Sequence, residues 1–439
     1  MSGLTRGPGM RQTGFRWTFV FVVNVAVFCV FAELLALGIF YYEHGWLFYI
    51  DPYRPTIGRI DEGSSDALTA VGLHPYFGPT HRPGIPFDVP PPLRTGEADE
   101  AVSTNNFGFP SRVDYPFSKA SDRQFFIGIF GGSVGAYFCR VGAARLEESL
   151  RRSESFNNRE PVTLCFSHEG YKQPQQLLVL SYFLSIGQRF DLVINIDGFN
   201  EVALGRINDR FGWDISMPSH EHLDALINVV NQATLTPAKL ESLARIVRYR
   251  QQLNDIAERS NRTRFASIEF VLRRYYNFLR RRYEQERVRF DGLPSNPPAN
   301  SPIHITPNVR PRNGSALYED IAANWHDASV LMQQMLAARS IPYLHVLQPN
   351  QYYSSRVFST AEKAVAFNDA SPFKEGAANG YPFLEKALEP GALNAVHLFD
   401  AVRESVYVDD CCHYTSTGYR LLADFIARAV VTSHGAATH

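Results

Sequence analysis

The sequence predicts an α/β protein in which a mostly parallel sheet lies between two layers of helices. The main observation is that short apolar segments alternate with segments of helical character from about residue 123 onwards. Strands of a parallel sheet that helices cover on both faces are apolar along their whole length, as these segments are. The composition agrees, because 45% hydrophobic and 20% charged residues are typical of a globular domain.

The alternation defines the expected elements. In chain order they are a strand at 125–130, a helix at 137–152, a strand at 161–166, a helix at 173–187, a strand at 191–196, a helix at 316–338, a strand at 343–348, a strand at 395–399 and a final helix from about 415 to 433. We therefore place one domain at 123–433, with an insertion at about 205–315. Residues 46–122 are rich in Pro, Gly and Asp without clear periodicity, which predicts an irregular segment that wraps the domain or forms a stalk.

The segment 17–42 is almost wholly apolar, and only Asn24 and Glu33 interrupt it. At about 1.5 Å per residue, a helix of this length crosses a hydrocarbon core of about 30 Å. Three arginines and no acidic residue precede it, namely Arg6, Arg11 and Arg16. The positive-inside rule then predicts a single-pass anchor with residues 1–16 in the cytoplasm and the domain in the periplasm or outside the cell. The alternative is a cleaved signal peptide, but the apolar run is longer than a usual signal core.

The insertion is expected to be helical and basic. Apolar residues at three- and four-residue steps form one stripe, made of Phe265, Ile268, Leu272, Tyr275 and Leu279. The segment 259–289 holds ten arginines and only three acidic residues. This pattern fits a solvated charged face, and it also fits a surface that contacts lipid headgroups or another anionic partner.

The overall charge and the cysteine content argue against several classes of partner. A formal net charge of −1 gives no global field that favours nucleic acid. The five cysteines are too few for a disulfide scaffold, and their spacing fits no zinc ribbon or finger. We therefore predict neither a metal nor a cofactor, although Cys411, Cys412 and His413 are adjacent. Cys139 and Cys165 are candidates for a disulfide outside the cytoplasm.

A serine with the features of a nucleophile follows the first predicted strand. Ser133 lies in GGSVG, which matches G-x-S-x-G, a sharp turn that exposes a nucleophilic serine; the alternative is a tight loop of small residues. Asp410 and His413 precede the last helix, where an imidazole can take the serine proton and an acid can orient the imidazole. Asp409 is a second candidate for the acid, and the three-residue spacing favours Asp410. A polar loop that caps the helix is the simpler interpretation of this segment.

Two further candidates lie at the ends of the second and third predicted strands. Gly170 can present an unobstructed backbone N–H, and the Asn200 side chain can donate to a negatively charged oxygen. In open α/β sheets, ligands bind at this carboxyl edge. Considered alone, each position also fits an ordinary turn, because Gly, Asn and Asp are common turn residues.

Taken together, these segments resemble the SGNH (GDSL-type) hydrolase family. The four matching blocks are Gly131-Gly132-Ser133, then Gly170, then Gly198-Phe199-Asn200-Glu201, and finally Asp410-Cys411-Cys412-His413. The resemblance covers roughly 120–205 and 316–433, and it implies a flavodoxin-like sheet. Two positions depart from the family pattern: Gly132 replaces the Asp of the first block and Glu201 the Asp of the third. These departures put specificity and local turn geometry in doubt more than the chemistry.

The resemblance implies a serine esterase with Ser133 as nucleophile, His413 as base and Asp410 as the orienting acid. The Ser133 and Gly170 backbone N–H groups and the Asn200 side chain would form the oxyanion hole. The expected substrate is an acetyl or short-chain ester on an extracytoplasmic carbohydrate or lipid. An O-acyltransferase that acts on envelope polysaccharide would use the same triad, and a non-catalytic binding or assembly module is the third hypothesis.

Overall fold

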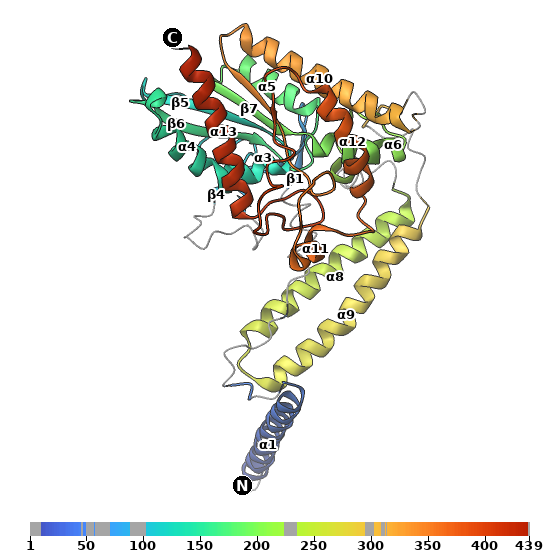
Figure 1. The fold of residues 1–439 in the computed structure, drawn as a ribbon. Helices are drawn as coiled ribbons and strands as arrows, with labels where there is room; N and C mark the ends of the chain where they lie inside the picture. Colours follow the sequence, from blue (N-terminus) through green and yellow to red (C-terminus); the bar gives the residue numbers. More distant parts are fainter. Residues whose placement is uncertain are drawn as a thin grey trace, which may run out of the picture. The chain divides into compact units, whose positions relative to one another are not determined.

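We describe a computed structural model of the chain (Figure 1). It describes residues 10–44, 47–49, 57, 71–87, 102–223, 235–294, 303–308, 312 and 314–437. The chain divides into two compact units. The anchor unit comprises Met1–Ala67 and Gln232–Ser301, and the α/β unit comprises Leu68–Asn231 and Pro302–His439. The start of the predicted cytoplasmic segment, most of 46–101 and much of the Pro-rich end of the insertion lie outside the described residues.

The α/β unit contains a five-stranded parallel sheet, which confirms the predicted fold class. The strands are β5 (Gln124–Gly131), β6 (Glu160–Ser167), β7 (Leu192–Asp197), β8 (Tyr343–Leu347) and β9 (Leu393–Asn394), in the spatial order β6-β5-β7-β8-β9. The prediction of a strand at 395–399 was wrong, because β9 ends just before it and these residues form a turn. Ala395, Val396 and Phe399 are apolar because this turn is buried in the core.

Helices cover both faces of the sheet, because successive side chains of a strand point to opposite sides (Figure 1). On β5, Phe125, Ile127 and Ile129 face the core cluster that includes α4 (Ala143–Arg151) and α13 (Ser416–Ala437). Phe126 and Phe130 face the other cluster, which includes α5 (Gln175–Ser185) and the end of α10 (Ser315–Ala337). The buried apolar strands thus account for the three layers.

The strand order reverses direction at β5. The chain leaves β5 to form β6 on one side, and it then returns to form β7 on the other side of β5. In open α/β sheets, ligands bind at the carboxyl ends of strands at such a point. β5 ends at Gly131 and β7 ends at Asp197, so the segments with Ser133 and Asn200 both begin at this edge of the sheet.

The α/β unit contains further short elements around the sheet. They are α3 (Ser133–Tyr137), a π-helical turn at Phe138–Gly142, a 3-10 turn at Glu154–Phe156, α6 (Phe199–Arg210), α11 (Thr360–Ala366), α12 (Lys374–Ala387) and two short antiparallel pairs, β1 (Val71–His74) with β2 (Gly78–His81) and β3 (Pro86–Phe87) with β4 (Val102–Ser103). Part of the segment predicted to be irregular therefore has strand pairing. A disulfide joins Cys139, in the π-helical turn, to Cys165 on β6.

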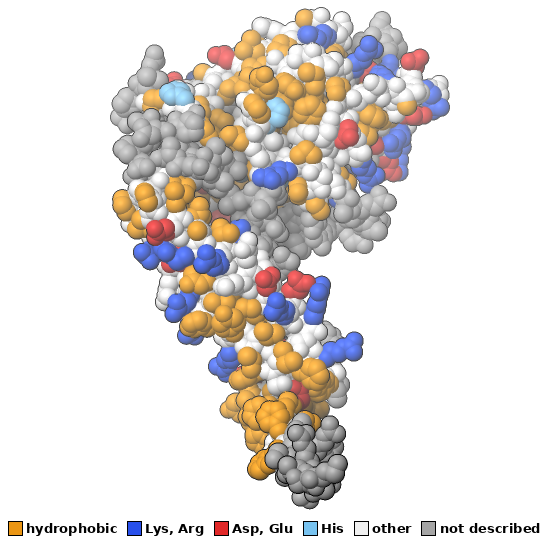
Figure 2. Space-filling view, turned by 180° about the vertical axis from the view of Figure 1, so that it is seen from behind, with side chains coloured by type: hydrophobic (Ala, Val, Ile, Leu, Met, Phe, Trp, Pro, Cys, Tyr) orange, Lys and Arg blue, Asp and Glu red, His pale blue; other side chains and the backbone are white. Residues whose placement is uncertain are grey.

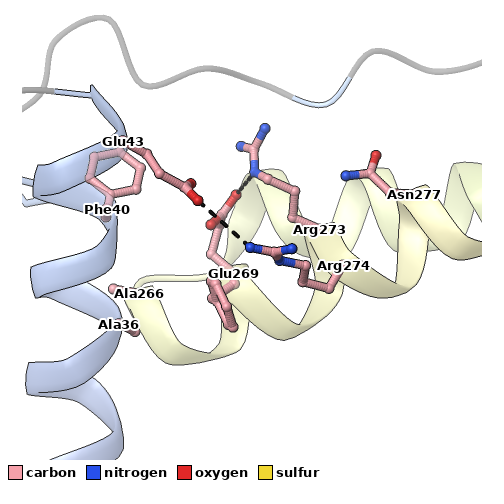
Figure 3. A pocket seen from close by; sticks show the side chains of 9 residues that line it. Ala36, Phe40, Glu43, Ala266, Glu269, Arg273, Arg274 and Asn277 are labelled. Carbon is pink, nitrogen blue, oxygen red and sulfur yellow. Dashed lines mark hydrogen bonds and ion pairs between the residues drawn. The ribbon is translucent and has the colours of Figure 1, made fainter.

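The anchor unit consists of α1 (Met10–His44) and a long hairpin of α8 (Pro237–Arg262) and α9 (Ala266–Gly292). The part of α1 at Phe19–Glu43 is long and apolar enough to cross a membrane. In the hairpin, Leu253 and Ile256 of α8 pack against Leu279 and Tyr283 of α9. Figure 3 shows the contact between α1 and α9, where Ala36 and Phe40 lie beside Ala266.

Glu33 has a structural partner in this unit. Its carboxylate accepts hydrogen bonds from the backbone N–H groups of Ala266 (2.7 Å) and Ser267 (3.0 Å), and also from the hydroxyl groups of Ser267 and Tyr49. These N–H groups are at the first turn of α9, where they lack partners within the helix. The acidic residue that interrupts the apolar segment is therefore a helix cap.

Candidate active site

Ser133 is the first residue of α3, directly after the glycine pair that ends β5. Gly131 has a φ of +146°, and a Cβ at this position would lie 2.2 Å from the carbonyl oxygen of Ile196 on β7. The chain can therefore turn sharply here only because the residue is glycine. As the first residue of a helix, Ser133 also presents a backbone N–H with no partner inside α3.

His413 lies against Ser133, although the two residues are 280 positions apart. The Nε2 atom of His413 is 2.7 Å from Ser133 Oγ, and its Nδ1 atom is 2.5 Å from a carboxylate oxygen of Asp409. Because an ionised carboxylate can only accept, Nδ1 carries the proton and Nε2 accepts from the serine hydroxyl. The three side chains form a continuous acid–imidazole–hydroxyl chain.

The acid in contact with His413 is Asp409, so the geometry corrects the choice of Asp410. Oδ1 of Asp409 accepts the backbone N–H groups of Cys411 (3.0 Å), Cys412 (3.1 Å) and His413 (3.2 Å), while Oδ2 contacts the imidazole. The loop wraps around this carboxylate, and an acid four residues before His413 therefore reaches the imidazole. Asp410 contacts its neighbours through its backbone carbonyl, which accepts the Tyr352 hydroxyl at 2.8 Å.

Asn200 lies at the same edge of the sheet, in the first turn of α6. Its Nδ2 donates to the carbonyl of Tyr171 at 2.8 Å, and the amide carries a second N–H on the same nitrogen. A Cβ at residue 132 would lie 2.2 Å from this Nδ2 and 3.0 Å from the Tyr171 carbonyl. A side chain at residue 132 would therefore displace the Asn200 amide from its position beside the serine turn.

Gly170 belongs to the loop after β6, and the structure brings this loop to the same edge. His168 N–H donates to the carbonyl of Gly131 at 3.4 Å, and Asn200 holds Tyr171 as described. Gly170 has a φ of +74°, and a Cβ there would lie 2.4 Å from the His222 ring. The imidazole of His222 therefore packs directly on this glycine, a contact that sequence analysis did not anticipate.

Glu201, the second departure from the family pattern, joins the loops that carry Gly170 and Asn200. One carboxylate oxygen accepts the backbone N–H of Gln173 at 2.9 Å, and the other accepts that of Gly198 at 2.8 Å. Burial, together with the nearby charge of Asp197, raises the pKa of the Glu201 carboxyl. The longer side chain of Glu therefore lets one residue fix the positions of both loops.

The electrostatics favour a paired Asp409 and His413. Burial alone would raise the pKa of Asp409, but the hydrogen bond and charge of His413 lower it below its ordinary value. For His413, burial disfavours the charged ring, yet the charges of Cys412 and Asp409 raise its pKa above the ordinary value. The Tyr137 ring packs edge-on against His413, with ring centroids 5.0 Å apart, and it shields this side of the imidazole.

Two groups of described residues have the composition of metal ligands. They are Cys411, Cys412 and His413, and His81, His168 and Glu169. In the first group, both nitrogens of His413 are already engaged by Asp409 and Ser133. In the second, His81 Nε2 lies 2.9 Å from a Glu169 oxygen, and His168 Nδ1 contacts the Glu169 carbonyl at 2.8 Å. Several of the candidate ligand atoms thus already have hydrogen-bond partners, whereas His168 Nε2 is buried without one among the described residues.

Comparisons with known proteins show only distant likeness. No protein-family profile and no curated protein sequence matches the chain. Among solved structures, the lipase Lip_vut3 from a goat rumen metagenome is similar with a TM-score of 0.33 and 11% identity, over 70% of this chain and 97% of that one. A protein named as an acylhydrolase from Bacteroides fragilis has a TM-score of 0.28 and 10% identity, over 73% and 91%. At these TM-scores the function has to be argued from the site itself.

Proposed function

We propose that the protein is a serine esterase, with Ser133 as nucleophile, His413 as general base and Asp409 as the acid that orients the imidazole. The observation that carries the proposal is the chain of contacts Asp409–His413–Ser133, with distances of 2.5 and 2.7 Å. The distance between His413 Nε2 and Ser133 Oγ lies in the range in which a base can take a proton from a hydroxyl group. The four-block resemblance to the SGNH family supports the same assignment.

In the proposed reaction, Ser133 Oγ attacks an ester carbonyl while its proton moves to Nε2 of His413. The protonated imidazole then gives this proton to the departing alcohol, and an acyl-serine remains. Water, activated by the same imidazole, attacks the acyl-serine and releases the acid. Asp409 remains ionised throughout and stabilises the charged ring.

The oxyanion that forms in both steps needs donors on the opposite side of the reacting carbon. We assign this role to the backbone N–H groups of Ser133 and Gly170 and to the second N–H of Asn200. Support comes from the Asn200 amide, which lies against the serine turn at Gly132. One such donor contributes about 3–4 kcal/mol to transition-state stabilisation.

The proposed substrate is a small acyl ester, acetyl or short-chain, on an extracytoplasmic carbohydrate or lipid. Ser133 is only 7% exposed, which favours a short acyl group over a bulky one. Transfer of the acyl group to a sugar hydroxyl is the alternative, because the same triad can activate either water or a sugar hydroxyl as the acceptor. A non-catalytic binding module is the third hypothesis, and the intact chain of contacts argues against it.

We also propose that α1 is retained as a membrane anchor, with its N-terminus in the cytoplasm and the α/β unit on the other side. Cleavage after an apolar signal would remove Glu33, and the first turn of α9 would lose its cap. The pairing of α1 with α9 is continued by Glu43, whose carboxylate lies 3.7 Å from Arg274 (Figure 3). Extraction of membranes at alkaline pH tests this, since an anchored chain stays in the pellet.

The Arg-rich helix α9 is proposed to contact anionic lipid headgroups. The predicted apolar stripe is only partly buried: Leu279 packs inside the hairpin, whereas Phe265, Ile268 and Tyr275 are about half exposed. Figure 2 shows hydrophobic and basic side chains side by side along this hairpin. An apolar face next to α1 with basic residues around it suits the boundary between acyl chains and headgroups.

The first experiment is labelling of the full chain, in detergent, with a fluorophosphonate probe, in parallel with hydrolysis of p-nitrophenyl acetate. Both are expected for the wild type and neither for Ser133→Ala. Hydrolysis of the donor alone supports the esterase, whereas turnover only with donor and sugar acceptor together supports the transferase. A folded wild type that neither reacts with the probe nor turns over either combination would contradict the enzyme hypothesis.

A further inference from the structure

The loop between Asp409 and His413 consists of one further acid and two adjacent cysteines. The Sγ atoms of Cys411 and Cys412 lie 3.1 Å apart, closer than the ~3.5–4.0 Å typical of non-bonded contacts between carbon atoms. Cys412 is buried and Cys411 is partly exposed, so a reagent can reach the pair from one side. Neither sulfur has a role in the proposed acyl transfer.

The backbone already holds the two cysteines in place. Their N–H groups both donate to Oδ1 of Asp409, at 3.0 and 3.1 Å. Closing a ring between two residues whose amides are already fixed costs little further conformational entropy. In the structure both thiols are free, with their sulfur atoms in contact.

A second pair of cysteines in the α/β unit is already oxidised. Cys139, in the π-helical turn that follows α3, forms a disulfide with Cys165 on β6. Disulfides persist in extracytoplasmic compartments and are rare in the cytosol. The proposed location of the α/β unit would expose Cys411 and Cys412 to the same oxidising conditions.

We propose that Cys411 and Cys412 form a vicinal disulfide in the mature protein, and that this bond keeps a competing thiol away from His413. The bond forms between the two sulfurs as their two thiols lose two protons and two electrons. The oxidant is the disulfide of a protein oxidase or of a small molecule. Thiol–disulfide exchange reduces this disulfide to two thiols. No other co-reactant is needed.

The consequence for the site rests on the proposed function. When reduced, Cys412 lies close enough to His413 to interact with its ring, and this thiol competes with Ser133 and Asp409 for the imidazole. Burial raises the pKa of the Cys412 thiol, but Cys411 and His413 lower it below the ordinary value, which favours a thiolate beside the base. A disulfide has neither a proton nor a charge to offer, so His413 remains paired with Asp409 and Ser133.

The test begins with the full chain, purified from the membrane without reductant and denatured with N-ethylmaleimide and a chelator. In peptide mass spectrometry, the Cys411–Cys412 peptide should be unmodified and lighter by two hydrogen atoms than the dithiol form. After reduction it should take up two N-ethylmaleimide groups. Cys29, a free cysteine of α1, serves as the alkylated reference. Alkylation of both Cys411 and Cys412 before reduction would overturn the proposal.

The second measurement is the rate of fluorophosphonate labelling before and after reduction. Reduction should slow the wild type by roughly tenfold, which is the effect of losing about one hydrogen bond. Cys411→Ser cannot form the vicinal disulfide but retains the Cys139–Cys165 bond. Its labelling should therefore be slow before reduction and should not change on reduction, which separates the effect of the vicinal pair from that of the Cys139–Cys165 bond. Equal rates for the oxidised and reduced wild type would overturn the link to His413. If the wild type is never labelled, the proposed function fails, and the peptide masses still decide the disulfide.

Discussion

The α/β unit contains two acid–histidine–serine arrangements, and only one of them has the features of a catalytic site. In the first, His413 lies between Asp409 and Ser133, as described above. In the second, Nε2 of His345 is 2.8 Å from Asp197 and its Nδ1 is 2.8 Å from Ser329 Oγ. The same three side chains thus occur twice, at similar distances.

The two arrangements differ in their surroundings. Asp197, His345 and Ser329 lie inside the core between the sheet and α10, with 2%, 3% and 0% exposure. Trp325 donates to the same Asp197 oxygen at 2.7 Å, and Glu389 adds a second carboxylate, 3.1 Å from Nδ1. By contrast, the side chains of His413 and Asp409 are 17% and 35% exposed, and His413 lies beside Ser133 just after β5.

Access explains why this difference matters. The pKa of His345 is raised to about 10, because Asp197 and Glu389 outweigh the effect of burial, and the pKa of His413 is raised as well, so the direction of the shift does not separate the two sites. Exposure does separate them, because no substrate can reach a serine with 0% exposure. The comparison teaches that residue types and distances define a triad only together with access and with oxyanion donors.

The largest expected effect separates the two serines. Ser133→Ala should lower kcat for p-nitrophenyl acetate by about 10⁴-fold or more, because it removes the nucleophile. Ser329→Ala should leave fluorophosphonate labelling intact and lower the free energy of unfolding by about 1–3 kcal/mol, since His345 and Tyr343 lose a partner. If a folded Ser329→Ala protein is no longer labelled, the assignment of the chemistry to Ser133 is wrong.

The next effect separates the two adjacent acids. Asp409→Asn should lower kcat by about 10²–10⁴-fold, because the amide no longer holds His413 in the required tautomer. Asp410→Asn is the matched control and should keep its activity, since its known contact is through the backbone. If Asp410→Asn has the larger effect in steady-state kinetics, the assignment of the acid is reversed.

The third effect concerns the oxyanion donors proposed for the first arrangement. Asn200→Ala should lower kcat by about 10²–10³-fold with little change in KM, because the amide acts on the transition state. Gly132→Ala should have a similar effect, since its Cβ would displace Asn200. Equal activity of Gly132→Ala and wild type would mean that Asn200 is not a donor in the reaction.

The smallest effect is a pH dependence of stability that originates from His345. Its pKa is raised when folded, so the ion pairs with Asp197 and Glu389 stabilise the protein fully below about pH 6.5 and are lost as the pH rises through about 10. Denaturant unfolding should show this decline for the wild type. In Glu389→Gln, where Asp197 alone remains as the charged partner, the decline should still begin near pH 6.5 but end at a lower pH, and the total loss of stability should be smaller. An identical pH profile for the two proteins would show that Glu389 does not hold the charge on His345.

Much of the fold follows from local pattern. The three apolar segments at 125–130, 161–166 and 191–196 became adjacent parallel strands, because continuous apolar runs with helices between them have few other stable arrangements. The segment at 395–399 shows the limit of the method. A short apolar run can be buried as a turn just as well as it can be buried as a strand. The helices α11 and α12 were not predicted at all.

For the site, the sequence by itself placed Ser133, Gly170 and Asn200 at one edge of the predicted sheet, since the carboxyl ends of parallel strands share one edge. The tertiary structure decided which acid contacts His413, because two neighbouring Asp residues differ only in how the loop directs their carboxylates. It also decided that Glu33 caps α9 and that His345 lies buried between Asp197 and Glu389. The caps and buried pairs depend on contacts between residues more than a hundred positions apart, and the choice of acid depends on the exact path of one short loop, so local sequence pattern carries no information on either.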